Sequence, residues 1–309
     1  MPSPQLAGDI LSDYGQRMLT EVLRRFNRTY TQRIGVLDES FLGTGRPLAV
    51  SRLLFEVGNA GPVGVRELRE LLDLDSGHLS RMLRRLEDDG LVATVVDPAD
   101  RRRRLVELTT DGRHAYDDLE RRSEERAGTL VAPLTTRQQE RLATALATAD
   151  LLVRAATVRL REVASDDPAA REATRRYFAE LDRRFPDGFD PGGPDAPEPG
   201  ATYVVATSDG APVAYGGIRP LPAAGEGTAE IKRMWVDGDW RGASLGARML
   251  RHLEDLARAQ GFTGVVLDTN GSLVEAIAMY ERAGYERIER YNDNPYAEAF
   301  FAKELSSTS

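Results

Sequence analysis

Residues 65–113 read VRELRELLDLDSGHLSRMLRRLEDDGLVATVVDPADRRRRLVELTTDGR, and this stretch decides the fold of the first half of the chain. Its apolar spacing predicts two short helices, over 63–72 and 77–90, joined by a turn at Asp75, Ser76 and Gly77. Residues 91–96 and 103–109 alternate like two strands around a turn, which predicts a hairpin. Two helices followed by a basic hairpin make a winged helix-turn-helix.

The second of these helices has an apolar face and a polar face. Helical spacing puts four apolar side chains on the buried side, namely Leu79, Met82, Leu83 and Leu86. The outward side chains carry hydrogen-bond donors that suit base edges and phosphates in a major groove. These outward residues are Ser76, His78, Ser80, Arg81, Arg84 and Arg85.

The tip of the hairpin is strongly basic. It carries four consecutive arginines, Arg101, Arg102, Arg103 and Arg104. A run of arginines that stands alone is usually a solvated surface. Because this run lies on a hairpin directly after two helices, we interpret it as a DNA-binding wing that reaches a narrow, strongly negative minor groove.

Longer helices are predicted on both sides of this stretch. Residues 8–31 carry a helical apolar stripe, and residues 47–58 form a helix that ends at Gly58. Residues 109–111 cap a helix that continues to about Arg126, and a further helix over 135–156 follows Pro133. The apolar stripe of the first helix comprises Ile10, Leu11, Tyr14, Met18, Val22 and Phe26.

The winged region resembles the MarR family of dimeric regulators, most specifically at DPADRR (97–102), at LVELT (105–109) and at Gly112. The resemblance covers roughly residues 8–156. It implies a homodimer through the N-terminal domain, with recognition helices in successive major grooves of a double-stranded DNA operator. It also implies a salt bridge by which Asp100 orients Arg102, and small-molecule binding between the dimerisation helices and the DNA-binding lobe. A thiol-redox switch is excluded because cysteine is absent.

The second half of the chain alternates strands and helices. A strand over 158–163 precedes a helix over 166–185, for which Asp167 is the expected cap. Residues 186–200 are rich in Pro and Gly; a disordered linker is one interpretation, and we favour a long loop inside the second domain. The remaining expected elements are strands at 202–207, 211–219, 228–236, 263–268, 285–290 and 297–304 and helices at 243–260 and 273–283.

Residues 229–262, AEIKRMWVDGDWRGASLGARMLRHLEDLARAQGF, combine a strand, a loop of small residues and a helix. Amides at a helix N-terminus suit a pyrophosphate, and Arg241 can add a charge-assisted contact. Such a turn alone is weak evidence, because many of them only close a tight connection.

The following residues 267–288, LDTNGSLVEAIAMYERAGYERI, make the signal specific. They resemble the second signature of the GNAT acetyltransferases at Ala276, Met279, Tyr280, Gly284 and Tyr285. This resemblance covers about residues 157–305. It implies a GNAT acyl-CoA N-acyltransferase fold with a mixed, splayed sheet.

The GNAT resemblance also implies a set of site residues. Acetyl-CoA lies between two splayed strands, where a main-chain amide polarises the thioester carbonyl and Tyr280 donates a proton to the leaving thiolate. Glu230 is the candidate base, directly or through water; the alternative is a surface carboxylate at a strand end. The residues expected to bind acetyl-CoA are Met234, Trp235, Val236, Arg241, Gly242, Ala243, Ser244, Leu245, Gly246, Asn270 and Tyr280.

Two positions depart from the GNAT pattern. Ser244 stands where the first glycine of the phosphate loop is usual. Either its Cβ lowers the affinity for the pyrophosphate, or its hydroxyl adds a hydrogen bond to a phosphate. Leu273 stands where an asparagine is common, and Asn270 lies nearby but out of register. Neither change removes a catalytic group.

Composition limits the class of protein. The 309 residues carry a net charge of −8, no Cys and three His, and 41% of them are hydrophobic, which fits two globular cores and gives no metal site. No stretch approaches the roughly 18 apolar residues of a membrane span, and the N-terminus lacks the pattern of a secretory signal. We therefore expect a cytoplasmic protein with no membrane partner.

Two domains are expected from these patterns. Residues 1–156 form a mainly α winged helix-turn-helix domain for DNA binding and dimerisation, and residues 157–309 form an α/β (α+β) acetyltransferase domain. The leading hypothesis is a regulator that also acetylates a small-molecule amine; acidic residues over 286–298 favour a cationic one. One alternative is a non-catalytic sensor of acetyl-CoA or another ligand, and another is two tethered but independent activities.

Overall fold

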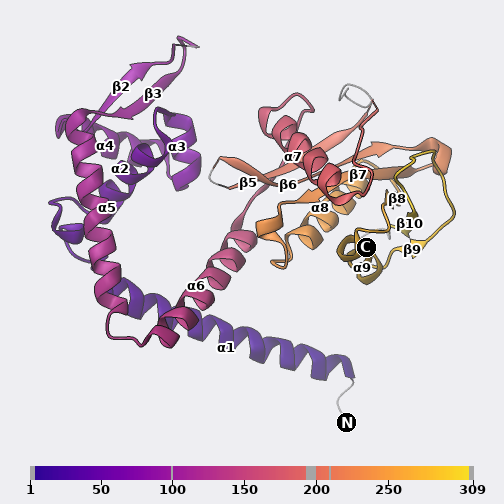
Figure 1. Ribbon diagram of the computed structural model, residues 1–309, viewed down its shortest axis with the longest axis horizontal. Coiled ribbons are helices and arrows are strands. Elements are labelled where there is room, and N and C mark those ends of the chain that lie inside the picture. Colours follow the sequence, from indigo (N-terminus) through magenta and orange to yellow (C-terminus); the bar gives the residue numbers. More distant parts are fainter. Residues whose placement is uncertain (1–3, 99, 193–199, 209, 306–309) are drawn as a thin grey trace. The chain divides into compact units, whose positions relative to one another are not determined.

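The computed structural model describes residues 4–98, 100–192, 200–208 and 210–305, with side chains from residue 17 onward. The chain divides into two compact units, Met1–Arg141 and Leu142–Ser309 (Figure 1). The expected domain boundary between residues 156 and 157 stays a prediction. Ala99 of the wing and residues 193–199 of the expected loop lie outside the described residues. In the part that is described, no helix is both long and apolar enough to cross a membrane.

The first unit is helical with a small sheet, as the sequence predicts. Helix α2 runs past Gly58 to Ala60, because Gly61 (φ +71°) is the residue that leaves helical geometry. Helix α5 runs past Arg126 to Val131, since no proline lies between its start and Pro133. The elements are α1 (Pro4–Arg33), η1 (Phe41–Gly43), α2 (Leu48–Ala60), β1 (Val63–Gly64), α3 (Val65–Leu72), α4 (Ser76–Asp88), β2 (Val92–Val96), β3 (Arg104–Leu108) and α5 (Thr110–Val131), followed by α6 (Thr136–Thr157).

Helix α4 begins and ends where the sequence predicts. The carboxylate of Asp75 accepts a hydrogen bond from the backbone N–H of His78 at 2.8 Å, which caps the N-terminus. Gly90 (φ +70°) takes the left-handed conformation that stops the chain from continuing as a helix. The four predicted apolar residues of α4 are all buried, in one core with Leu53 and Leu54 of α2.

The wing is an antiparallel pair in which Val92 lies opposite Leu108 and Val96 opposite Arg104. The two-residue strand β1, which the sequence did not reveal, pairs with the edge of β3 that lies opposite β2. At the base of the wing, Thr109 donates to the carbonyl of Gly90 (2.6 Å) and caps α5 through the N–H of Gly112 (2.9 Å). A Cβ at Gly112 would lie 1.8 Å from the carbonyl oxygen of Leu91, so this position of the motif requires glycine.

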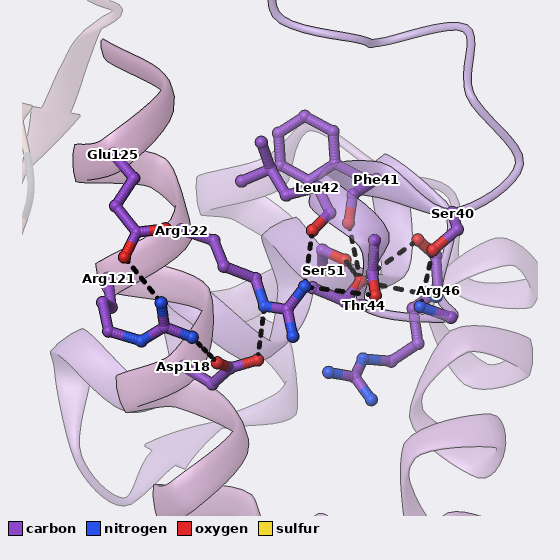
Figure 2. A network of polar contacts seen from close by, with 12 residues as sticks. Ser40, Phe41, Leu42, Thr44, Arg46, Ser51, Asp118, Arg121, Arg122 and Glu125 are labelled. Atoms are coloured by element: carbon purple, nitrogen blue, oxygen red, sulfur yellow. Dashed lines mark hydrogen bonds and ion pairs between the residues drawn. The ribbon is translucent and has the colours of Figure 1, made fainter. Parts of the chain in front are cut away.

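A polar network joins α5 to the turn before α2 (Figure 2). Arg122 donates to Asp118 at 2.7 Å and to the carbonyl oxygens of Leu42 and Gly43 at 3.1 and 3.4 Å. Within the turn, the Thr44 hydroxyl donates to the carbonyl of Phe41 at 2.8 Å. The network holds the entrance of α2 against α5; the ligand expected between the two lobes stays a prediction.

The second unit is a seven-stranded mixed sheet in the order β4–β5–β6–β7–β8–β10–β9. All neighbouring strands are antiparallel except β7 and β8, which are parallel. The elements are β4 (Leu160–Val163), α7 (Pro168–Arg184), β5 (Thr202–Ser208), β6 (Ala211–Pro220), η2 (Pro222–Ala224), β7 (Thr228–Val236), η3 (Gly238–Trp240), α8 (Leu245–Ala259), β8 (Gly264–Thr269), α9 (Val274–Arg282), β9 (Glu286–Arg287) and β10 (Ala299–Glu304).

The expected strand over 285–290 is too long: β9 comprises only Glu286 and Arg287, and the N–H of Ile288 makes one further bond to the carbonyl of Phe300 at 2.9 Å. Beyond them, the Arg290 guanidinium donates to the carbonyl oxygens of Asn292, Asn294 and Ala297. These bonds fold residues 290–297 into a loop, so the chain leaves the sheet early. Asp167 caps α7 as predicted, accepting from the N–H of Ala169 at 2.8 Å.

Helices cover both faces of the sheet (Figure 1). Helices α8 and α9 pack on one face, which we call the α8 face. Helix α7 packs on the other, the α7 face, where Ala170 and Ala173 contact Tyr203, Tyr215 and Trp235. The large buried side chains of the α8 face include Ile218, Leu245, Met249, Leu250, Leu253 and Phe301.

Candidate functional sites

The sheet splays between its two parallel strands. Strands β7 and β8 pair only from Thr228 to Glu230 and from Gly264 to Val266. Beyond this point β7 continues to Val236 and β8 to Thr269 without pairing to each other. The backbone groups that face the gap are therefore available to a ligand, as the sequence predicted for these strands.

A β-bulge in β7 decides on which face of the sheet the side chains at the gap lie. The register with β6 shifts between Tyr215 and Gly217, and Arg233 on β7 takes a left-handed backbone (φ +54°). Arg233 consequently lies on the α7 face, over the ring of Phe178 (5.6 Å), although strict alternation would place it on the α8 face. Met234 then packs on the α8 face and Trp235 on the α7 face.

The loop between β7 and α8 ends at a helix whose N-terminus has no side-chain cap. Gly242 (φ +80°) and Ser244 (φ +61°) are both left-handed, and the Ser244 side chain makes no capping hydrogen bond. A Cβ at Gly246 would lie 3.2 Å from Sδ of Met279 and 3.6 Å from Cγ2 of Val236. Glycine therefore suits position 246 because α8 lies close to Met279 and Val236 there, and the N–H groups at the start of α8, which no side chain caps, fit a phosphate group.

Arg241, at the start of the loop before α8, is held in place by Glu180 of α7. Its guanidinium hydrogen-bonds to Glu180 of α7 and to the carbonyl of Val236 (3.1 Å). Glu180 also accepts from Nε1 of Trp235 at 2.9 Å. Burial alone would raise the pKa of Glu180, but the bonds from Arg241 and Trp235 outweigh it and leave the pKa below its usual range.

Tyr280 lies beside Met234, on the part of β7 that has separated from β8. Its side chain is 5% exposed, its ring packs against Tyr285 and Phe301, and its hydroxyl lies 4.0 Å from Sδ of Met234. Burial raises the pKa of Tyr280 well above its usual value, and the nearby Tyr177 and Asp268 raise it further. The hydroxyl is therefore protonated at neutral pH, as a proton donor must be.

Glu230 is not the surface carboxylate that was the alternative expectation, since it is only 1% exposed. Arg219 pairs with its Oε2 at 2.6 Å, and Lys232 lies 3.8 Å away. Tyr291 donates to its Oε1 at 3.0 Å. Neither Arg219 nor Tyr291 was expected as a partner, because they come from a neighbouring strand and a distant loop.

Asn270 lies in the turn between β8 and α9. Its side-chain amide donates to the carbonyl of Tyr296 at 2.8 Å, and its Oδ1 accepts from the N–H of Ser272 at 2.9 Å. These bonds hold the start of α9 beside the loop before β10.

The candidate DNA-binding side chains lie on two exposed surfaces of the first unit. On α4, His78 is half-buried and the other five predicted residues are exposed, and all four arginines of the wing are exposed. The expected salt bridge from Asp100 to Arg102 is replaced by a main-chain contact, in which the N–H of Arg102 donates to Oδ1 of Asp100 at 3.0 Å. Asp100 thus closes the turn, and the side chain that is paired is Arg103, with Glu67 at 2.6 Å.

Comparisons with known proteins assign both units. The sequence model of the Acetyltransferase (GNAT) family matches residues 159–285, and that of the MarR family matches residues 44–103. The uncharacterized N-acetyltransferase YjgM of Escherichia coli (strain K12) is 31% identical over 131 residues, which are 40% of this chain and 78% of YjgM. The chain belongs to the GNAT acetyltransferase family and carries a MarR-family domain ahead of its GNAT domain.

Two further relatives represent the two halves. The N-alpha-acetyltransferase RimI of Mycobacterium tuberculosis is 33% identical over 126 residues, covering 39% of this chain and 77% of RimI. The crystal structure of the reduced form of MarR from E. coli matches 41% of this chain and 93% of that chain, with 26% identity and a TM-score of 0.37. Both predicted resemblances are confirmed, so this is a MarR-type regulator fused to a GNAT domain of the general acyltransferase class, which uses an acyl-CoA.

Ser244→Gly should stabilise the GNAT domain by about 0.5–1 kcal/mol, because glycine removes the cost of a left-handed backbone, partly offset by a freer unfolded chain. Chemical denaturation of the full chain measures this. Ser244→Ala is the matched control: it removes the hydroxyl and keeps the left-handed backbone, so no gain in stability is expected. A glycine variant less stable than the native protein would contradict the left-handed backbone at Ser244. Titration calorimetry with coenzyme A then tells whether the serine is a handicap or a phosphate contact. If the hydroxyl contributes to binding, its loss lowers the affinity for coenzyme A in both variants.

Proposed function

We propose that the protein is a dimeric DNA-binding regulator whose GNAT domain transfers an acetyl group from acetyl-CoA to a small-molecule amine. The observation that carries the catalytic part is Tyr280, a buried and protonated hydroxyl at the gap where β7 and β8 separate. A domain that only sensed a ligand would have no need of a proton donor at this place.

The residues at the gap fit acetyl-CoA. Main-chain groups of Met234, Trp235 and Val236 would bind the pantetheine arm, and the amides of residues 241–246 would bind the pyrophosphate. Asn270 stays in the proposed binding set through its place at the start of α9. Once bound, the thioester supplies an activated acyl carbonyl to the amine.

The protein's own groups would move the protons. Transfer forms an N–C bond and breaks a C–S bond, and an ammonium nitrogen loses two of its three protons. Glu230 is the proposed acceptor of the first, directly or through water, and passes it to solvent. Tyr280 gives its proton to the leaving thiolate and regains one from the nitrogen, so the enzyme ends unchanged.

Tyr280→Phe keeps the ring but removes the proton donor. Turnover of acetyl-CoA with an amine should fall by roughly 10²–10⁴-fold, while coenzyme A affinity in calorimetry stays within about twofold. Tyr285→Phe is the matched control, because it removes a hydroxyl from the neighbouring ring of the same cluster without touching the gap. Full turnover by the Tyr280 variant would exclude Tyr280 from the reaction.

The DNA-binding part of the proposal is supported by α4, by the wing and by the exposed apolar face of α1. Residues in this last set are between 46% and 67% exposed, which is unusual for large apolar side chains on one helix and favours burial in a homodimer. The set comprises Met18, Leu19, Val22, Leu23, Phe26 and Tyr30.

Arg102→Ala should weaken operator binding about equally for all sequences and lower the salt dependence by about one unit of slope, as expected when one phosphate contact is lost. Arg84→Ala should instead change the sequence preference. Fluorescence anisotropy over a salt series measures both. Arg126→Ala, an exposed arginine on α5, is the control and should leave affinity and slope unchanged. An unchanged slope in the Arg102 variant would place the wing away from DNA.

A second candidate function, ligand-dependent control of DNA binding, is favoured by the end of helix α6. This helix begins at Thr136 and ends inside the core of the GNAT domain, where Ala155 is fully buried. Arg248 of α8 donates to the carbonyl oxygens of Ala155 and Val158. Arg154 lies over the ring of Trp240, 4.9 Å from its centroid, directly before the proposed phosphate loop. A ligand that orders this loop would therefore also act on α6.

If the two functions are coupled, saturating acetyl-CoA should change the operator Kd at least about fivefold. Arg248→Gln should abolish that change while acetyl-CoA still binds, because the link to α6 is lost. Arg251→Gln, on an exposed position of the same helix, is the control and should keep the effect. Equal operator affinity with and without acetyl-CoA in the native protein would mean that the two domains act independently.

A further inference from the structure

Two carboxylates lie on the α7 face of the sheet beside the gap. Glu230 is opposite Val266 in the register of β7 and β8, so Asp268, two residues further along β8, faces the same side. Phe300 lies opposite Asp268 on β10, and Tyr291, the partner of Glu230, packs edge-on against Phe300 at 5.5 Å. Asp268 stands past the last β7–β8 pair, where the two strands have separated.

The two carboxylates differ in what compensates their charge. Glu230 has two cations of the protein, Arg219 and Lys232. Asp268 makes no ion pair with a described residue, although Arg290 lies over the ring of Phe300 (4.8 Å) on the opposite strand, and its hydrogen bonds come from neutral amides. Asn292 and Asn294 both donate to its Oδ2, at 2.6 and 3.2 Å, which leaves Oδ1 for another donor.

Asp268 also lies close to the proposed proton donor. Its charge contributes to the raised pKa of Tyr280 on the α8 face and of Tyr177 on the α7 face, after burial as the main cause. The register agrees, because it places Asp268 just past the last β7–β8 pair, at the gap between the two faces.

Aromatic side chains continue from Asp268 along the α7 face. The side chain of Asn294, which donates to Asp268, also accepts from the N–H of Tyr296 at 3.1 Å. The Tyr296 ring contacts that of Phe189 at 4.9 Å, and Phe189 contacts Phe178 of α7 at 5.2 Å. These rings are only partly buried, so they can contact the apolar body of a bound molecule.

We propose that Asp268 binds the acceptor as an ammonium cation, and that the acceptor is a small primary amine with an apolar or aromatic body. This inference rests on the acyl transfer proposed above and names its acceptor class. Both amide donors lie on Oδ2 of this half-buried carboxylate, so Oδ1 can accept a charge-assisted hydrogen bond from an ammonium group in a partly water-excluded place. Glu230 attracts a cation less strongly, because Arg219 already neutralises it.

The test uses 2-phenylethylamine and its neutral analogue 2-phenylethanol, titrated into the full-length protein saturated with coenzyme A. The native protein should bind the amine at least about tenfold more tightly than the alcohol. Asp268→Asn should remove that preference while leaving affinity for the alcohol and for coenzyme A unchanged. The asparagine keeps the acceptor for Asn292, so the site should stay folded. Asp255→Asn, an exposed carboxylate on α8, is the matched control and should bind both probes like the native protein.

The outcomes separate this inference from the acyl transfer on which it rests. A native protein that binds amine and alcohol equally, or an Asp268→Asn variant that keeps the preference for the amine, would overturn the role of Asp268. In either case a Tyr280-dependent transfer to some amine would still stand. If the amine preference depends on Asp268 and yet no acetyl group is transferred, the site is an amine-binding site and the transfer proposal fails alone.

Discussion

The early end of the β7–β8 pairing is the constraint on which the GNAT domain depends. Parallel strands that stayed paired would satisfy each other's backbone groups and would close the sheet between the α7 and α8 faces. Because the strands separate after Glu230 and Val266, backbone groups of β7 and β8 stay available to a ligand. Side chains from both faces of the sheet can also approach the gap between the strands. The bulge at Arg233 completes the arrangement, because it turns Met234 toward Tyr280 and holds Trp235 against α7.

Local patterns predicted most of the fold, because the signals for its elements lie within a few residues. Asp75 and Gly90 bound α4, Asp167 caps α7, and the four apolar residues of α4 are buried as their spacing indicates. The errors arose where distant contacts decide the outcome. Residues 288–290 alternate like a strand, but Arg290 is drawn to carbonyl groups of a later loop, and so the chain leaves the sheet.

The candidate site was predictable only in part, for the same reason. The motif around Tyr280 is contiguous, so the sequence alone singles that residue out and its role stays a prediction, whereas the partners of Glu230 come from β6 and from the loop that holds Tyr291. Asp268 had a local signal, a carboxylate at the end of the buried run Val265–Leu267, but nothing in the sequence shows that its charge lacks a cation. Compensation of charge is a property of the folded neighbourhood.

Charge compensation also explains why two similar carboxylates on one face suit different tasks. Glu230 is held in one orientation by its ion pair with Arg219 and accepts a hydrogen bond from Tyr291, so it attracts a further cation only weakly. Asp268 is oriented by two amides that carry no net charge, so its orientation is fixed while its charge remains uncompensated. In the acyl transfer that we propose, the ammonium group of the substrate supplies the ion-pair partner that Asp268 does not find among the described residues.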